Sequence, residues 1–73
     1  MAESAKMQIF HQYQRFNNIA TCLHRAYLEL KHNNAGEAIQ HLLTAEFNGL
    51  SRQITEPLIA EIESSRNENH PRR

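Results

Sequence analysis

The side chains in this 73-residue chain with the greatest capacity for chemistry are five histidines and one cysteine. A structural zinc site needs roughly four converging ligands, usually contributed as pairs at close spacing. The histidines form no such pairs, and Cys22 and His24 are two residues apart, which directs them to different faces of a helix. The sequence therefore predicts no metal site. Because histidine changes charge close to physiological pH, the histidines are instead expected to make association sensitive to pH. They are His11, His24, His32, His41 and His70.

Carboxylates and hydroxyls do not complete a catalytic site either. The chain contains no aspartate and no glycine-rich phosphate loop, and no serine is followed by a base at a recognisable spacing. Glu61 and Glu63 are two residues apart and face away from each other on a helix. Cys22 lies beside an apolar row, where a small, half-buried apolar role is expected. The sequence predicts a protein that is not an enzyme and has no cofactor.

The size of the chain favours helix packing and self-association as its sources of stability. A chain this short buries only about 60% of the surface that its unfolded form exposes. The single cysteine excludes a disulfide within the chain, which leaves regular helix packing and oligomerisation. The lone thiol and the absence of a signal peptide indicate a reducing compartment, and no apolar run approaches the roughly 20 residues of a membrane span. We expect a cytoplasmic protein with no membrane partner.

A long helix over residues 7–32 is the strongest prediction. No glycine or proline interrupts residues 7–30, and apolar residues recur at alternating spacings of four and three, as in a coiled-coil heptad. This row, here called the seam, consists of Ile9, Tyr13, Phe16, Ala20, Leu23, Tyr27 and Leu30. A flanking set widens the row beyond a two-stranded coiled coil, as suits a helix bundle. It consists of Met7, Phe10, Ile19 and Ala26.

A second helix is predicted over residues 35–50. Asn33 tolerates the left-handed conformation that follows a helix end, and the Asn34 side chain is expected to cap the next helix by accepting from the amide of Glu37. The second helix has one large apolar row and one row of mostly small residues, and Gly49 is explained either by close packing or by a helix end. The rows are Ile39, Leu43, Phe47, Leu50 and Ile54, and Ala38, Leu42, Ala45 and Gly49. So short a connection predicts antiparallel helices.

Residues 22–50 also resemble a single tetratricopeptide repeat. Four residues fall where that family places small and packing side chains: Ala26, Ala38, Leu42 and Ala45. The chain departs from the family pattern at Leu50, where the terminal proline would be, and at Glu29, where an aromatic residue is usual. The resemblance implies two antiparallel helices and nothing about a ligand.

The region around Pro57 predicts a short third helix. Proline removes an amide and disfavours helix at the preceding residue, so we expect a break near residues 51–56, with Thr55 as a cap. A short helix over 56–64 would follow, carrying Leu58, Ile59 and Ile62. The chain thus divides into a frayed N-terminus (1–6), a helical domain (7–64) and a disordered tail (65–73).

These elements predict an all-α fold: an antiparallel helical hairpin with a short third helical segment, assembled as a homodimeric four-helix bundle. A 26-residue helix is about 39 Å long, too long for the shorter second helix to cover. The charges agree with this arrangement, because residues 1–33 carry four basic and two acidic side chains, whereas residues 34–63 carry one basic and five acidic ones. Such halves are expected to lie beside each other, within one chain or between chains.

The sequence accordingly predicts a small regulatory or adaptor protein that works by protein–protein interaction. It would mask a transcription factor, act as a chaperone or modulate an enzyme, with itself and another protein as partners. The dimer or partner interface is predicted to comprise the seam together with Leu42, Leu43 and Phe47. An alternative docking segment consists of Leu58, Ile59 and Ile62, which Pro57 would free to swing.

Two other functions stay open at this point. One is a nucleic-acid-associated transcriptional regulator that uses the basic first helix and tail. Its contacts would be Arg15, Arg25 and Lys31, with the terminal Arg72 and Arg73, although a formal net charge of zero argues against a dedicated nucleic-acid binder. The other is a purely structural oligomerisation element.

Overall fold

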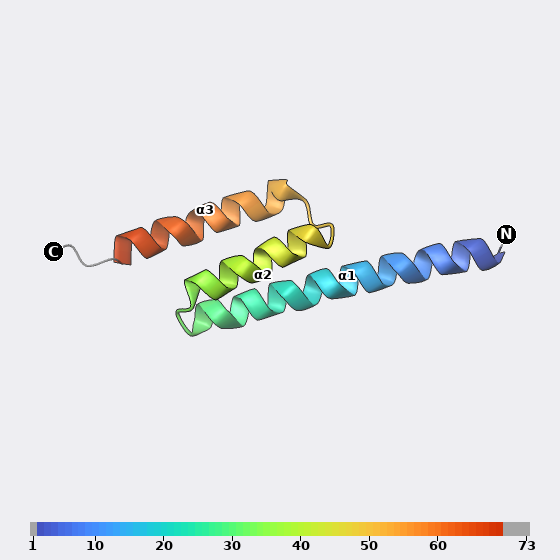
Figure 1. Cartoon of the computed structure of the whole chain (residues 1–73), viewed down its shortest axis with the longest axis horizontal. Helices are drawn as coiled ribbons and strands as arrows, with labels where there is room; N and C mark the ends of the chain where they lie inside the picture. The colour runs from blue at the N-terminus through green and yellow to red at the C-terminus, as the bar shows by residue number, and fades with distance from the viewer. Residues whose placement is uncertain (1, 70–73) are drawn as a thin grey trace.

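The chain folds into three α-helices. The computed structural model describes the backbone of residues 2–69 and the side chains of residues 4–66. Within these residues there is no strand, and the helices are α1 (Ala2–Lys31), α2 (Ala35–Phe47) and α3 (Arg52–Asn69) (Figure 1). The predicted all-α class is confirmed.

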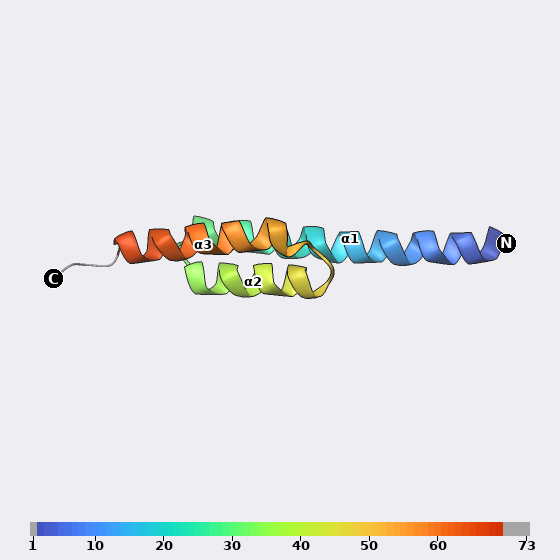
Figure 2. The same cartoon turned by 90° about the horizontal axis from the view of Figure 1, so that it is seen from above.

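The helices are arranged around α2. From the end of α1, α2 runs back along the C-terminal half of α1, and α3 turns again and runs along α2 (Figure 1). In the view turned by 90°, α1 and α3 lie at one level and α2 lies below both (Figure 2). In the described chain, α2 contacts both other helices, but no Cα atom of α1 comes within 8 Å of a Cα atom of α3. The molecule is therefore open on the side opposite α2.

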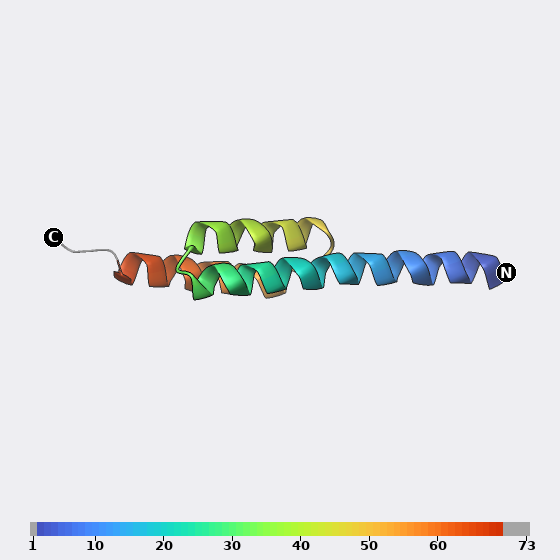
Figure 3. The ribbon, with the colours of Figure 1, turned by 90° about the horizontal axis from the view of Figure 1, so that it is seen from below.

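The N-terminal half of α1 projects beyond both other helices. Figure 3 shows it extending past the α2–α3 connection with no neighbouring helix. Every side chain from residue 4 to residue 18 is exposed. We call residues 4–18 the arm. The arm gives the molecule its greatest extent of 65 Å along one axis, against 22 and 11 Å along the others.

The α1–α2 connection is a Schellman motif. Asn33 adopts φ +62°, its amide donates to the Leu30 carbonyl (3.0 Å), and the Asn34 amide donates to the Glu29 carbonyl (2.8 Å). The predicted capping box at Asn34 is wrong, because its side chain makes no cap hydrogen bond. The Asn34 Nδ2 group donates to Glu29 Oε1 (2.9 Å), and this charge-assisted hydrogen bond turns the side-chain amide towards α1.

The α2–α3 connection begins with a second Schellman motif, formed at Gly49. This residue adopts φ +116°, its amide donates to the Glu46 carbonyl (2.9 Å), and the Leu50 amide donates to the Ala45 carbonyl (3.0 Å). Leu50 also packs against Ala45. Gly49 therefore ends α2, so the second of the two explanations of this glycine holds, and α2 stops three residues before the predicted end at residue 50.

Replacing Gly49 by Ala should destabilise the protein by about 1 kcal/mol or more, because a Cβ atom is strained at this backbone conformation. The added Cβ atom would also lie 3.0 Å from Arg15 Nη1 and 3.2 Å from Arg15 Cδ. The matched control is Gly36→Ala, whose Cβ atom would meet nothing within 4 Å and which improves helix propensity. Urea unfolding followed by circular dichroism measures both variants. Equal midpoints would show that the Gly49 turn has no conformational requirement for glycine.

Helix α3 begins earlier than predicted, at Arg52. Ser51 caps it, because the Ser51 Oγ atom accepts from the Gln53 amide (3.1 Å) and the Ser51 carbonyl accepts from the Thr55 amide (3.1 Å). The predicted break at residues 51–56 and the cap at Thr55 are wrong: Thr55 is fully buried within the helix, and Pro57 lies inside it. Pro57 lacks the amide that would donate to the Gln53 carbonyl. Because Pro57 is close to the start of the helix, this one missing hydrogen bond does not break it.

Helix also extends further than predicted at both ends of the chain. Helix α1 begins at Ala2 rather than residue 7, and α3 continues to Asn69 rather than ending at residue 64. Residues 2–6 include two alanines, a glutamate and a lysine, which favour helix, and neither glycine nor proline occurs in residues 58–69. Residues 2–6 and 65–69, which were predicted to be frayed or disordered, are therefore helical in the structure. Residues 1 and 70–73 lie outside the described residues.

The core consists of two small clusters on α2. One contains Ile19, Cys22 and Ala45, with Leu50 packed against it, and the other contains Ala26, Ala38 and Leu42, with Ile59 and Ile62 packed against it. The small row of α2 thus faces its neighbours, and Ala38 and Ala45 are fully buried. On α1, the buried face consists of Ile19, Cys22 and Ala26. This face lies about 100° around the helix from the seam. The chain does not bury the seam against its own α2.

Candidate protein-interaction surface

The seam remains exposed along the whole of α1. Ile9, Tyr13 and Phe16 on the arm are more than half exposed, at 68%, 63% and 59%. Ala20 is exposed as well, and the row continues with Leu23, Tyr27 and Leu30, which are also exposed. In all, thirteen large apolar side chains are exposed, whereas Ile19 and Leu42 are the only large aliphatic ones that are buried in the described chain. The seam is the contiguous part of this exposed surface, and contiguous apolar patches are typical of interaction sites.

The C-terminal half of the seam forms one wall of a groove. The groove has a volume of about 310 Å³ and lies between α1 and α3, on the open side of the molecule. Leu42 of α2 closes it from below. Its walls are Leu23, Ala26, Tyr27 and Leu30 of α1, and Leu58, Glu61 and Ile62 of α3. A concave apolar channel between two helices is the kind of site that receives a further helix.

Glu61 is the only charged side chain that lines the groove. It is exposed, and neither Glu61 nor Glu63 forms an ion pair with any described side chain. A helix that enters the groove would therefore meet an almost wholly apolar surface with one carboxylate at the α3 wall. Such a site favours an apolar helix that carries a basic residue.

The predicted docking segment after Pro57 does not swing free. Ile59 and Ile62 pack against the core cluster of Ala26, Ala38 and Leu42, because residues 52–69 form one continuous helix along α2. Leu58 is 42% exposed and faces the groove. The segment thus supplies one wall of the groove rather than a mobile element.

The three predicted α2 interface residues occupy different surroundings. Leu42 is buried, at 3% exposure, and belongs to the core and the groove floor. Leu43 and Phe47, one helical turn apart, are exposed on a different face of α2, at 44% and 91%. The structure therefore joins Leu42 to the seam and separates Leu43 and Phe47 from it.

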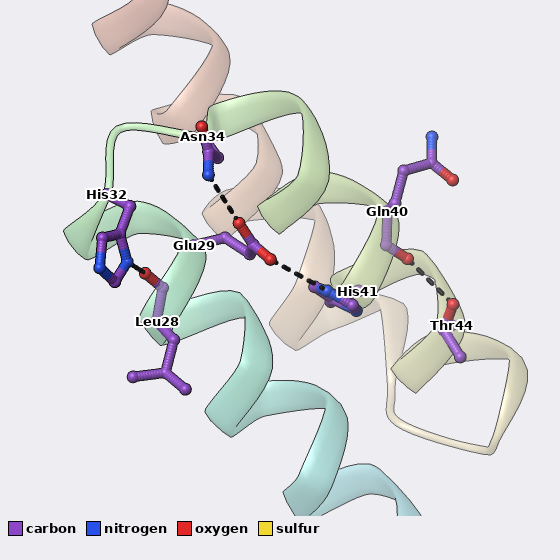
Figure 4. A network of polar contacts seen from close by, with 7 residues as sticks. All are labelled: Leu28, Glu29, His32, Asn34, Gln40, His41 and Thr44. Atoms are coloured by element: carbon purple, nitrogen blue, oxygen red, sulfur yellow. Dashed lines mark hydrogen bonds and ion pairs between the residues drawn. The ribbon is translucent and has the colours of Figure 1, made fainter.

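Polar contacts near the α1–α2 connection involve two of the histidines (Figure 4). His41 Nε2 lies 3.8 Å from Glu29 Oε2, and His32 Nδ1 is 2.8 Å from the Leu28 carbonyl oxygen. Among the described side chains, no three of histidine, cysteine and glutamate are grouped so that they could hold a metal ion. His70 lies outside the described residues.

The ion pairs do not follow the predicted pairing of a basic half with an acidic half. Arg52 Nε lies 2.9 Å from Glu46 Oε2, and Arg52 Nη2 lies 3.2 Å from Glu56 Oε2, so both pairs fall within the acidic half. Together with Thr55, whose Oγ1 donates to Glu46 Oε1 (3.4 Å), they hold the start of α3 on α2. In the described part of the chain, the basic residues of α1 have no glutamate partner.

The three predicted nucleic-acid contacts do not form one patch. Successive helical residues are about 100° apart, so Arg15, Arg25 and Lys31 project in directions that differ by about 80° to 160°. Two of them also lie over neighbouring aromatic rings, with Arg15 Cζ 5.1 Å from the Phe16 ring centre and Lys31 Nζ 5.7 Å from the Tyr27 ring centre. Arg72 and Arg73 lie outside the described residues.

The sequence did not identify Glu61 as a groove residue or Ser51 as the cap of α3. Serine is a preferred N-cap, and Ile54, Leu58 and Ile62 follow Ser51 at four-residue spacing, so that row was available as a signal for a longer α3. Recognising the groove also required the position of α3 relative to α1, which no spacing within one helix reveals.

Comparison with known proteins assigns no relative to the chain: no family model, curated protein or solved structure matches it. Within the described residues, no helix combines the length and apolar character needed to cross a membrane.

Proposed function

We propose that this chain is a non-catalytic regulatory or adaptor protein that acts through protein–protein interaction and works as a homodimer. In this proposal α1 and α2 form an antiparallel helical hairpin, and two chains complete a four-helix bundle through the seam. The observation that carries the proposal is the exposure of thirteen large apolar side chains among residues 4–66. Their burial against a partner would supply stability that so small a core lacks.

Two separate apolar surfaces support the two kinds of partner. The seam and the groove form one continuous surface that suits self-association, because three residues of the seam also form the α1 wall of the groove: Leu23, Tyr27 and Leu30. Leu43 and Phe47 lie outside that surface, and they offer an aromatic and an aliphatic side chain to another protein. Exposed aromatic anchors of this kind contribute a large share of the binding energy at protein interfaces.

Leu23→Asp should convert the dimer into a monomer or an unfolded chain, because it places a charge in the centre of the seam. Leu28→Asp is the matched control: Leu28 is 37% exposed and Leu23 is 36% exposed, but Leu28 lies about 140° around α1 from Leu23. Sedimentation equilibrium gives the mass of each variant, and circular dichroism gives its helix content. A wild-type chain that is a stable monomer, or equal behaviour of both variants, would contradict the proposal.

Salt dependence separates this function from nucleic-acid binding. An apolar interface should keep its dissociation constant nearly unchanged, whereas contacts to several phosphates lose about 10³-fold in affinity or more between about 50 and 200 mM salt. The wild-type chain should also retain the same protein from native extract at raised salt, and Phe47→Asp should lose it, because Phe47 is 91% exposed on the second apolar surface. Salt-sensitive binding to duplex DNA with no retained protein would favour the nucleic-acid alternative.

A further inference from the structure

The arm and the groove are two halves of one apolar row. The arm carries Ile9, Tyr13 and Phe16 with no helix beside them, and the α1 wall of the groove continues the same row with Leu23 and Leu30. Each half spans seven residues, or about 10.5 Å of helix. A surface whose two halves match in this way can pair with itself about a two-fold axis.

We propose that the arm of one chain lies in the groove of a second copy, and that the second copy returns the same contact. This inference rests on the proposed homodimer and specifies how it is built. Each groove is formed by α1, α2 and α3 of one chain, so the inserted arm becomes the fourth helix of a local bundle. The dimer then contains two such bundles, each composed of three helices from one chain and one arm from the other.

The seam itself indicates where the two-fold axis passes. An axis beside residues 19 and 20 exchanges Ile9 with Leu30 of the second copy and Phe16 with Leu23 of the second copy, with the two α1 helices antiparallel. Tyr13 then lies opposite Ala26 of the second copy, a small side chain that also lines the groove. Ala20 then lies at the crossing point. Ala20 is exposed in the single chain, and its small side chain allows two helices to approach closely.

Charge supports the same pairing. The described side chains of the arm include two basic ones, Lys6 and Arg15, and no acidic one. The groove offers Glu61 at its α3 wall, which has no ion-pair partner in the described chain. Opposite charges on the inserted helix and on α3 would fix the direction and register of the arm more than they would raise its affinity.

A second copy also accounts for more of the exposed surface than a different protein does. Any occupant of the groove covers Leu23, Tyr27 and Leu58. A second copy in this arrangement covers the arm of the same molecule in the same event, because the arm and the groove wall belong to one helix. All large apolar side chains of the seam then leave water together, which is the condition for a stable small dimer.

Leu58→Arg tests the groove, and Leu43→Arg is its matched control. The two leucines are 42% and 44% exposed, but only Leu58 lines the groove. In sedimentation equilibrium, Leu58→Arg should raise the dimer dissociation constant by about 100-fold or more, because a long charged side chain would fill the place that the apolar side chains of the arm occupy. Leu43→Arg should leave the constant unchanged. The reverse result would overturn the arm-in-groove contact while leaving a homodimer in place.

Ile9→Arg tests the arm without touching the packing of the chain, because Ile9 is 68% exposed and its helix has no neighbour there. This variant should be helical by circular dichroism and monomeric, whereas His11→Arg, on the other side of α1, should stay dimeric. Mixing Ile9→Arg with Leu58→Arg should restore a dimer, since one arm and one groove of the pair are then intact. A dimeric Ile9→Arg, or a mixture that stays monomeric, would overturn the inference; a monomeric wild-type chain would instead contradict the proposed function.

Discussion

Leu42→Ala is expected to remove most of the stability of this protein. Leu42 is 3% exposed, it belongs to the cluster with Ala26 and Ala38, and Ile59 and Ile62 of α3 pack against that cluster. Truncating a buried leucine to alanine usually costs about 2–5 kcal/mol, through lost burial and the cavity that remains. A domain of this size has a total stability of only about 4–11 kcal/mol at typical values per residue. One substitution would therefore remove a large share of it.

The adjacent leucine supplies the control for this prediction. Leu43 is 44% exposed, so Leu43→Ala leaves no cavity and should cost less than about 1 kcal/mol. Urea unfolding at one fixed protein concentration, followed by circular dichroism, compares the two variants with the wild type. Because Leu42 also forms the groove floor, its variant should weaken self-association as well. Equal losses at positions 42 and 43 would show that the cluster between α1, α2 and α3 does not hold the fold.

The sequence predicted the helices well because their signals are local. The apolar row of α1 repeats without interruption over residues 9–30, and the asparagines after Lys31 permit the left-handed turn that ends the helix. Position 34 shows the limit of such reasoning. A capping side chain has several acceptors and donors within reach, and Glu29, five residues earlier, competed successfully for the Asn34 side chain.

The candidate site was harder to predict, since it depends on how helices face one another. Periodicity identifies an apolar row but does not say which partner covers it. On α1 the flanking residues Ile19 and Ala26 pack against α2, and the more regular seam stays exposed. Small residues explain the choice: Ala38 and Ala45 let α2 approach the face of α1 that carries Cys22 and Ala26, whereas Tyr27 of the seam is too large for so close a contact.

The region around Pro57 was predicted from one residue and was decided by its neighbours. A proline near the start of a helix removes a single hydrogen bond, and that loss is offset when the rest of the helix is well packed. Here Thr55 and Ile59, on either side of Pro57, are both turned towards α2, and Glu46 of α2 accepts a hydrogen bond from Thr55 and pairs with Arg52. These tertiary contacts extend α3 back to Arg52 and thereby create the second wall of the groove.

Ala45→Leu is expected to force α1 and α2 apart. Ala45 is fully buried, in contact with Ile19 and Cys22 of α1, and Leu50 packs against it from the α2–α3 connection. An isobutyl group in place of the methyl group has no space at this contact, and overpacking of this kind typically costs about 1–3 kcal/mol. The loss of folding free energy should be at the upper end of this range, because the cluster around Ala45 is one of only two apolar clusters that join α2 to its neighbours in the described chain.

Ala60→Leu makes the same substitution at an exposed position of α3, and it should be nearly neutral because alanine and leucine both favour helix. Thermal unfolding compares the stability of the two variants. The reaction of Cys22 with a thiol reagent gives a local measurement, since Cys22 is 9% exposed and lies at the contact that Ala45→Leu would open. The thiol should react faster in Ala45→Leu and at the wild-type rate in Ala60→Leu. A protected thiol together with unchanged stability in Ala45→Leu would mean that α1 and α2 are not held together by close contact of small residues.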